Sequence, residues 1–305
     1  MGRIVLSGVE FKFEKVNDEL GETGVLKQNI FLNNNGLTEV EMDTITIIEN
    51  GAFKNCSNLT KALFPKIMIL GEEAFYYCSS LTNITLNNSL TEIKNKSFQR
   101  CGSLGSINLP SNLEKIGDFA FEYDTKLIIG NTLNNLKEIG IAAFQNCTSL
   151  NINFGVEKIT KIGEYAFYGC VNLQLSIFPP NLKTLEQGQF YGCVLCTFNF
   201  LPNKFTELPR QIFYGTGVTF KNLPFIKRLG DNCLGNCKNL TTLTLGSKGN
   251  PVEYITPYNL TGVVTFGSLY NCTNLTKLTI YTTGGQALAG APWGATNAAI
   301  TYLPA

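Results

Sequence analysis

One phenylalanine recurs along most of this chain at a nearly constant spacing. The steps between its neighbouring copies are 22 residues once and then 23 residues six times: Phe53, Phe75, Phe98, Phe121, Phe144, Phe167, Phe190 and Phe213. Self-similarity at a fixed period of this length is typical of solenoids, whose units cannot bury an apolar face alone and must stack. The sequence therefore predicts one extended repeat domain of stacked coils.

The first half of each repeat reads as a short helix or 3-10 turn. In the copy that starts at Ile162, the apolar residues Ala166, Phe167, Cys170 and Leu173 follow at offsets of 4, 5, 8 and 11. These offsets place them on one face of one or two helical turns. An acid early in the segment, Glu164 in this copy, suits the start of a helix dipole.

The second half of each repeat reads as a strand. In Leu81–Leu86 the final Ile-Thr-Leu alternates, with Ile84 and Leu86 on one face. Proline follows this stretch in several repeats and ends the strand, because proline cannot donate to a ladder. The register varies: residues 150–154 and 173–177 alternate from their first leucine, whereas Leu104–Leu109 has an extra residue first. Bulges or altered curvature are expected there.

The repeat I-G-x-x-A-F-x-x-C-x-x-L-x-x-I-x-L-P-x-x-L resembles the BspA-like leucine-rich repeat family, most closely in Ile93–Leu113 and Ile162–Leu182 and over roughly residues 45 to 280. The resemblance implies an α/β repeat fold, a right-handed leucine-rich-repeat solenoid with one strand plus a short helix or 3-10 turn per repeat of about 23 residues. It also implies surface proteins of anaerobic bacteria and some protists, often linked to adhesion. It brings no catalytic residue and no cofactor.

Three segments follow from where the repeat begins and decays. Residues 1–46 are expected to form an N-terminal cap that includes a first repeat strand at Leu37–Met42, and residues 47–280 the solenoid. The step from Cys237 to Cys272 is 35 residues, which predicts an insertion near 246–262. Residues 281–305 read as a C-terminal cap, with Trp293 either sealing the last coil or stacking on a sugar.

Composition argues against several functions. The chain has 305 residues, a net charge of +1, 15% charged residues and no histidine. Without histidine, Ser-His-Asp catalysis, Cys-His catalysis and histidine-ligated metal sites are excluded. The low charge argues against a nucleic-acid partner, which needs a clustered basic surface. Neither a signal peptide nor a membrane span is evident.

Eight of the ten cysteines occupy one slot of the repeat, and Asp124 and Thr216 stand in that slot in two further copies. A slot that accepts threonine asks for a small, weakly hydrogen-bonding side chain, so a ladder of free, buried thiols is expected rather than disulfides. The pattern fits a reducing or anaerobic setting. A zinc site built from Cys193, Cys196, Cys233 and Cys237 is the less favoured alternative.

Function is expected on the outward positions of the repeat strands, which are rich in Thr and Asn. The candidate binding residues are Thr82, Asn83, Thr85, Ser106, Asn108, Thr241, Thr242, Thr244, Thr276, Lys277 and Thr279. They predict an extended polar surface, although threonine is also simply a good exposed strand residue.

Three functions stay open at this point. The first is a non-enzymatic, monomeric binding or adhesion module for a protein or host-cell ligand at the cell surface or outside the cell. The second is a receptor-binding component of a phage or secreted particle, with a virion-associated or cytoplasmic location as the alternative. The third is a carbohydrate-binding module that uses Trp293 and scattered tyrosines.

Overall fold

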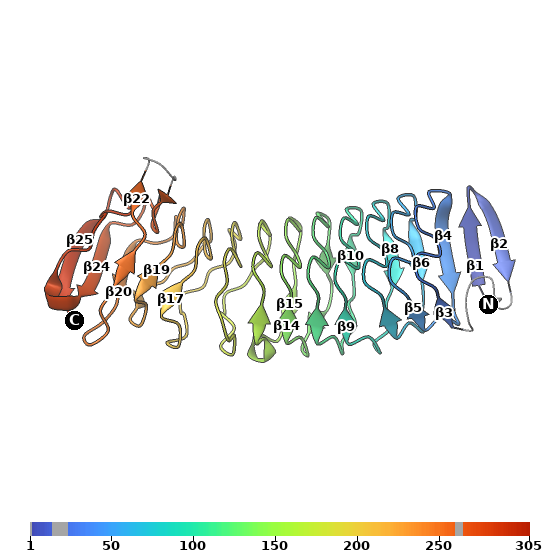
Figure 1. The fold of residues 1–305 in the computed structure, drawn as a ribbon, viewed down its shortest axis with the longest axis horizontal. Coiled ribbons are helices and arrows are strands. Elements are labelled where there is room, and N and C mark those ends of the chain that lie inside the picture. The colour runs from blue at the N-terminus through green and yellow to red at the C-terminus, as the bar shows by residue number, and fades with distance from the viewer. Residues whose placement is uncertain (1, 14–23, 260–264) are drawn as a thin grey trace. The chain divides into compact units, whose positions relative to one another are not determined.

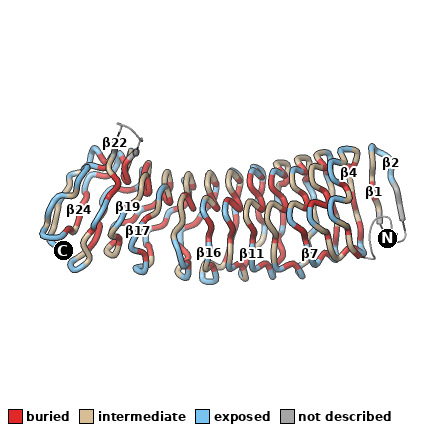
Figure 2. Tube along the Cα trace, viewed as in Figure 1, coloured by how far each residue is buried: buried red, intermediate tan, exposed pale blue. Residues whose placement is uncertain are grey.

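The computed structural model describes residues 2–13, 24–259 and 265–305. The chain divides into two compact units, Met1–Ala166 (unit 1) and Phe167–Ala305 (unit 2). Within each unit, successive coils lie side by side in chain order (Figure 1). Buried residues recur at matching places from one coil to the next (Figure 2), so each coil contributes its apolar side chains to a core shared with its neighbours.

Unit 1 carries two rows of short strands. The Thr row comes from the Leu-x-x-Ile-x-Leu stretches, and the Ile-Gly row precedes the recurring phenylalanine. The Thr row begins with an antiparallel hairpin and continues in parallel: β1 (Gly2–Leu6), β2 (Val9–Phe13), β4 (Leu37–Met42), β6 (Lys61–Leu63), β8 (Asn83–Thr85), β10 (Ser106–Ile107) and β12 (Ile128–Ile129). The Ile-Gly row consists of β3 (Val25–Leu26), β5 (Ile47–Ile48), β7 (Ile69–Leu70), β9 (Glu92–Ile93), β11 (Lys115–Ile116), β14 (Glu138–Ile139) and β16 (Lys161–Ile162). A further parallel pair joins β13 (Thr132–Leu133) to β15 (Asn153–Phe154).

Unit 2 continues both kinds of row in its own coils. Its Thr row is a parallel sheet of β18 (Asn222–Leu223), β20 (Thr242–Leu245), β24 (Lys277–Thr282) and β25 (Ala299–Pro304). Its Ile-Gly row is β17 (Glu207–Leu208), β19 (Arg228–Leu229) and β21 (Tyr254–Ile255), and a separate antiparallel pair joins β22 (Tyr258–Asn259) to β23 (Thr265–Phe266). The expectation of one strand per repeat is therefore too simple, because most coils with strands carry one in each row.

The expectation of a short helix or 3-10 turn in each repeat is wrong. The described residues contain two 3-10 turns, η1 (Val156–Lys158) and η2 (Thr283–Gly285), and neither includes a recurring phenylalanine. In the segment that was expected to be helical, residues two before and two after the phenylalanine have a positive φ, as in Glu73 (55°) and Tyr77 (59°) around Phe75. An α-helix requires negative φ throughout, so this alternation excludes it. Glu164 therefore does not lie at the start of a helix, and the expectation that it stabilises a helix dipole is wrong.

Backbone hydrogen bonds show what replaces the helix. The amides of Gly51 and Phe53 donate to the carbonyls of Glu72 and Ala74 in the next coil, at 2.9 and 2.8 Å. Between them, amides such as that of Lys54 donate three residues back, here to the Gly51 carbonyl at 2.9 Å. Turns along the chain thus alternate with ladder bonds across coils, and we call these stacked segments, from two residues before the phenylalanine to the cysteine slot, the turn column.

The turn column contains the densest part of the core. Phe53, Phe75, Phe98 and Phe121 are fully buried and stack nearly parallel, with neighbouring ring centroids 5.0 to 5.5 Å apart. Such offset ring pairs add to the stabilisation from burial alone. Beside them the slot thiols form a second column, in which Sγ atoms donate to the phenylalanine carbonyl of the preceding coil, including Cys56 to Phe31, Cys78 to Phe53, Cys101 to Phe75, and in unit 2 Cys193 to Phe167 and Cys237 to Phe213. Cys272 donates instead to the Leu234 carbonyl, where leucine replaces the phenylalanine.

All ten cysteines lie among the described residues, and each carries a buried thiol rather than a disulfide. The slot takes a small donor because a carbonyl of the previous coil faces it. Thr216 also donates, but to a carbonyl of its own coil: its hydroxyl donates to Phe213 at 2.7 Å, three residues back. Asp124 does not, because neither of its carboxyl oxygens has a hydrogen-bond partner although the side chain is fully buried.

The ends of the chain differ in detail from the expected segments, whose boundaries stay a prediction. Coil geometry already starts within residues 1–46, because β3 pairs with β5 and Phe31 stacks on Phe53 at 5.2 Å. The predicted insertion near 246–262 lies partly outside the described residues. Its described part contains a turn at Ser247–Asn250 and the strand β21. The right-handedness of the coil also stays a prediction.

Candidate binding surface

Both strand rows of unit 1 are interrupted at the same place along the stack. Neither β7 and β9 nor β8 and β10 are paired, although the strands on either side of each gap continue their ladders. In the Thr row the Thr60 carbonyl accepts from the Thr82 amide at 3.0 Å, and the Gly105 carbonyl accepts from the Ile128 amide at 3.1 Å. In the described structure, no amide of residues 104–109 donates to the carbonyl of Thr82.

The turn column crosses this interruption without a break. The amides of Phe75 and Tyr77 donate to the carbonyls of Ser97 and Gln99 at 2.8 and 2.9 Å, and the rings of Phe75 and Phe98 remain stacked. The two coils are therefore held together along the turn column, and again after the Thr row, where the Ser111 amide donates to Asn88 Oδ1 and Asn112 Nδ2 donates to the Asn88 carbonyl, both at 3.0 Å.

The separation coincides with a change in the recurring spacing. Partners in the Ile-Gly row are 22 residues apart before the gap, as in Ile47–Ile69, and 23 residues apart after it, as in Glu92–Lys115, whereas the Thr-row pair Ser106–Ile128 is again 22 residues apart. The coils that meet at the gap differ in circumference by one residue, and the backbone must absorb that residue somewhere round the coil. Contact is kept where the rings pack and lost in the short strands.

Lys94 stands where Gly71 and Gly117 stand in the flanking coils, and a Cβ on either glycine would come within 2.5 to 2.6 Å of the preceding coil. That side chain alone does not open the ladder. Glu49 occupies the same place two coils before Lys94, and its amide still donates to the Leu26 carbonyl at 2.9 Å.

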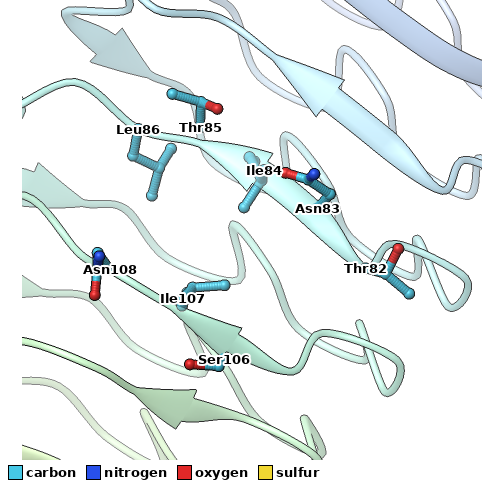
Figure 3. A pocket seen from close by; sticks show the side chains of 8 residues that line it. All are labelled: Thr82, Asn83, Ile84, Thr85, Leu86, Ser106, Ile107 and Asn108. Carbon is cyan, nitrogen blue, oxygen red and sulfur yellow. The ribbon is translucent and has the colours of Figure 1, made fainter.

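The gap in the Thr row is an open depression of about 550 Å³, and it gathers every candidate residue of unit 1. Its lining comprises Thr82, Asn83, Ile84, Thr85, Leu86, Ser106, Ile107 and Asn108. Figure 3 shows these side chains on β8 and β10, in Thr82 directly before β8, and in Leu86 and Asn108 directly after the two strands. The five predicted polar residues are exposed, whereas Ile107 is buried and Ile84 and Leu86 are half-buried. A second depression of about 350 Å³, lined in part by Ile69, Gly71 and Lys94, lies along the Ile-Gly row.

The chemistry of the larger depression is polar and uncharged. Hydroxyl and amide groups surround it, no carboxylate or ammonium lines it, and half-buried aliphatic side chains lie beneath them. Backbone groups at the facing strand edges add further donors and acceptors. Such a surface offers hydrogen bonds and apolar contact, but no acid, base or nucleophile with a shifted pKa.

The candidate residues of unit 2 form a different kind of surface. Thr242 lies beside Lys277 and Thr244 beside Thr279 in the closed parallel ladder of β20 and β24, and the Thr276 hydroxyl donates to the Thr241 carbonyl at 3.2 Å. Thr241, Thr242, Thr276 and Lys277 are exposed, whereas Thr244 and Thr279 are half-buried.

Unit 2 also presents large apolar residues at its surface. Ile177 is 62% exposed, although alternation from Leu173 placed it on the buried face, and Phe200 is 61% exposed. The reason is the proline that ends each stretch: the residue close before it, Phe178 or Leu201, takes the buried place and displaces its neighbour outward. Phe200 lies in a depression of about 490 Å³ with Asn199, Asn203, Thr219 and Lys221. The sequence signal that could have predicted this exposure is a pair of adjacent apolar residues directly before a proline, as in Ile177-Phe178 and Phe200-Leu201.

Trp293 does not offer a surface for a sugar. It is fully buried, its indole N–H donates to the Ala289 carbonyl at 2.9 Å, and its own carbonyl accepts from the Leu269 amide. Three tyrosines of unit 2, Tyr168, Tyr191 and Tyr214, stack on one another at 4.4 and 4.6 Å, so that the faces of the middle ring are covered. Burial also raises the pKa of Tyr191 to about 12.

The thiols are arranged for packing. Burial raises the pKa of the Cys56 and Cys272 thiols to about 11 and that of Cys193 and Cys233 well above the ordinary range. Raised values disfavour the thiolate that nucleophiles and metal ligands require. The described residues contain no group of three or more metal-ligating side chains, so the four cysteines considered for zinc do not converge.

The repeat can now be compared with known families. Residues 24–151 and 137–258 match the model of the BspA type leucine-rich repeat region, in six copies. The chain belongs to the BspA-type leucine-rich repeat family. The resemblance seen in the repeat pattern is thereby confirmed. Proteins built from such repeats are generally protein-binding modules, and the fold is typically non-enzymatic.

Solved structures agree on the fold. This BspA-type protein is similar to a leucine-rich repeat protein from Bacteroides ovatus, with 24% identity, a TM-score of 0.66, and coverage of 92% of this chain and 70% of that one. It is also similar to a leucine-rich cell surface protein from Faecalibacterium prausnitzii, with 21% identity, a TM-score of 0.57, and coverage of 92% and 77%. A search of curated proteins finds no match. None of the described helices is long and apolar enough to cross a membrane.

Proposed function

We propose that this BspA-type protein is a non-enzymatic adhesion module that binds a protein at a cell surface through the Thr row of unit 1. The observation that supports the proposal is the depression between β8 and β10, in which all five candidate residues of that unit meet. Solenoids commonly bind along one extended face, and this is the place where the face is hollowed. The candidate residues of unit 2 would form a second, flat contact surface, and the module would act as a monomer.

The test is capture of surface-labelled proteins from host-cell membranes by the immobilised protein. The decisive variant changes Thr82, Asn83, Thr85, Ser106 and Asn108 together to lysine, and its matched control changes three exposed threonines outside both candidate sets, Thr91, Thr125 and Thr148, in the same way. Loss of capture in the first variant alone supports the proposal. Equal capture by both variants would refute it for this surface.

Phe200 supports a second contact surface for the same function. An exposed aromatic ring beside a polar rim is the composition of a binding hot spot. Replacing Phe200 with serine removes the ring without opening the core, since the side chain is mostly exposed. If this variant loses capture while the lysine variant of unit 1 keeps it, the binding surface is to be assigned to unit 2. Capture of glycans on an array, or of phage or particle receptors in place of host surface proteins, would favour the other two functions.

A further inference from the structure

We propose that the opening between β8 and β10 binds an extended polypeptide segment, which pairs through its main chain with the strand edges there. The proposal rests on the proposed protein-binding function and names the chemistry of the partner. It assigns recognition to backbone hydrogen bonds, with side chains of the opening selecting the segment.

The strand edges supply the first part of the argument. A strand inside a ladder has both of its edges paired, yet here two sheets end facing each other across the opening, one that ends with the parallel strands β4-β6-β8 and one made of the parallel pair β10-β12. The edges carry unpaired donors and acceptors at the regular spacing of a strand. Such edges are templates for an added strand, and extended peptides bind other proteins in this way.

The lining supplies the second part. Thr85 and Asn108 are exposed beside the strand edges, while Ile84 and Ile107 provide apolar contact deeper in the opening. A segment that alternates small polar and aliphatic residues matches both layers. No charged residue lines the opening, so a neutral segment fits best.

Size and shape agree with a short segment. Three residues of β8 span about 10 Å at roughly 3.3 Å per residue. The volume of about 550 Å³ lies within the range of about 300–1,000 Å³ that is usual for ligand sites. A sugar is the weaker match, because no aromatic ring lines the opening, whereas facing strand edges are complementary to another strand.

The probe is a synthetic peptide with the sequence of residues 241–246, Thr-Thr-Leu-Thr-Leu-Gly, which is neutral and alternates threonine with leucine from Thr242 to Leu245. The control peptide carries Thr244→Pro, which removes one amide donor and disrupts pairing. Both are labelled and titrated with the full chain in a fluorescence anisotropy experiment. The first peptide is expected to bind at least about tenfold more tightly than the control.

A blocking variant locates the binding. Ser106→Tyr places a ring at the exposed edge of the opening without altering the backbone. Its matched control is Ile128→Tyr, because Ile128 pairs with Ser106 one coil further along, where the ladder is closed. Peptide affinity is expected to fall about tenfold or more in Ser106→Tyr and to stay within about twofold in Ile128→Tyr. Hydrogen exchange of residues 104–109 in the unaltered protein should slow when the peptide is added, which tests the site without any substitution.

Several results would overturn the proposal: equal affinity for the two peptides, unchanged affinity in Ser106→Tyr, or exchange protection that falls outside residues 82–109. A glycan that binds in the opening where the peptide does not would also overturn it. The proposed function fails separately. If surface proteins are captured but the two peptides bind equally well, the proposal of main-chain pairing is wrong and the proposal of protein binding is kept. If the first peptide binds more tightly, as expected, but no surface protein is captured, main-chain pairing is supported and the adhesion function is wrong.

Discussion

The turn column and the Thr row of unit 1 pass through the same coils, yet only one of them tolerates a change in repeat length. Across the junction between the 22-residue and 23-residue coils, the turn column keeps its ladder bonds and its ring stack. The Thr row and the Ile-Gly row both lose their pairing there.

The difference reflects how much each element buries. A fully buried phenylalanine between two other rings has no room to shift without leaving a void. A strand of two or three residues has few ladder bonds to lose, and its polar side chains are already in water. The mismatch therefore opens the strand rows, which become available for binding, while the turn column holds the coils together.

The largest effect is expected from Phe121→Ala, in the middle of the turn column. Phe121 is fully buried and stacks on Phe98 at 5.3 Å and on Phe144 at 5.4 Å. The free energy of unfolding of unit 1 should fall by about 3–5 kcal/mol, and hydrogen exchange should rise in the coils on both sides. Denaturant unfolding with exchange measurements checks both. An effect confined to one coil would contradict a shared core.

The next largest effect is expected at Asp124, which occupies the cysteine slot of its coil and whose carboxyl oxygens have no hydrogen-bond partner. Burial, and secondarily the charge of Glu122, raise the pKa of the Asp124 carboxyl well above its ordinary value. The folded state thus retains a proton that the unfolded state releases above about pH 4, so the free energy of unfolding falls as the pH rises through that range. Asp124→Cys restores the residue found in the neighbouring coils and should stabilise the protein by about 1–3 kcal/mol at pH 7.

The advantage of Asp124→Cys should shrink toward pH 4, where both states of the original protein are protonated. Thermal unfolding of the two proteins between pH 4 and pH 8 measures this trend. A constant difference across that range would show that the carboxyl does not titrate on unfolding.

A smaller pair of opposite effects separates close packing from backbone strain. Gly140 faces Asp118 and Gly117 of the preceding coil so closely that a Cβ would come within 2.5 to 2.6 Å of them, and Gly140→Ala should destabilise by about 1–3 kcal/mol. Two residues on, Ala142 has a φ of 49°, and Ala142→Gly should stabilise by about 1 kcal/mol. Opposite shifts in the melting temperature are expected, and a shift of the same sign in both variants would contradict the assigned turn geometry.

The smallest effect is expected in the Thr row. Asn108 is exposed beside the opening, and Asn108→Ala should change the free energy of unfolding by no more than about 0.5 kcal/mol. The same denaturation series measures it, with Phe121→Ala as the internal reference. A loss as large as that of the phenylalanine would mean that the Thr row, too, supports the fold.

Much of the architecture follows from the period of the sequence. The recurring Phe and Cys define the coils and the residues they bury, and the replacement of Cys by Thr216 identified the slot as one for a small donor. The outward positions Thr82, Asn83 and Thr85 were also recognisable from alternation. The helix was not excluded by the sequence, because buried residues at offsets of 0, 4 and 5 fit one helical face as well as a succession of tight turns.

The sequence by itself determined which residues repeat and therefore which side chains face a common core, since apolar burial depends mainly on residue type and spacing. It did not determine the path between them. The positive φ values at Glu73 and Tyr77, the outward turn of Phe200 and the opening between β8 and β10 were decided by contacts between successive coils. Those contacts join residues about 22 or 23 positions apart, and whether they can all form depends on the circumference of two neighbouring coils, which only the tertiary structure brings together.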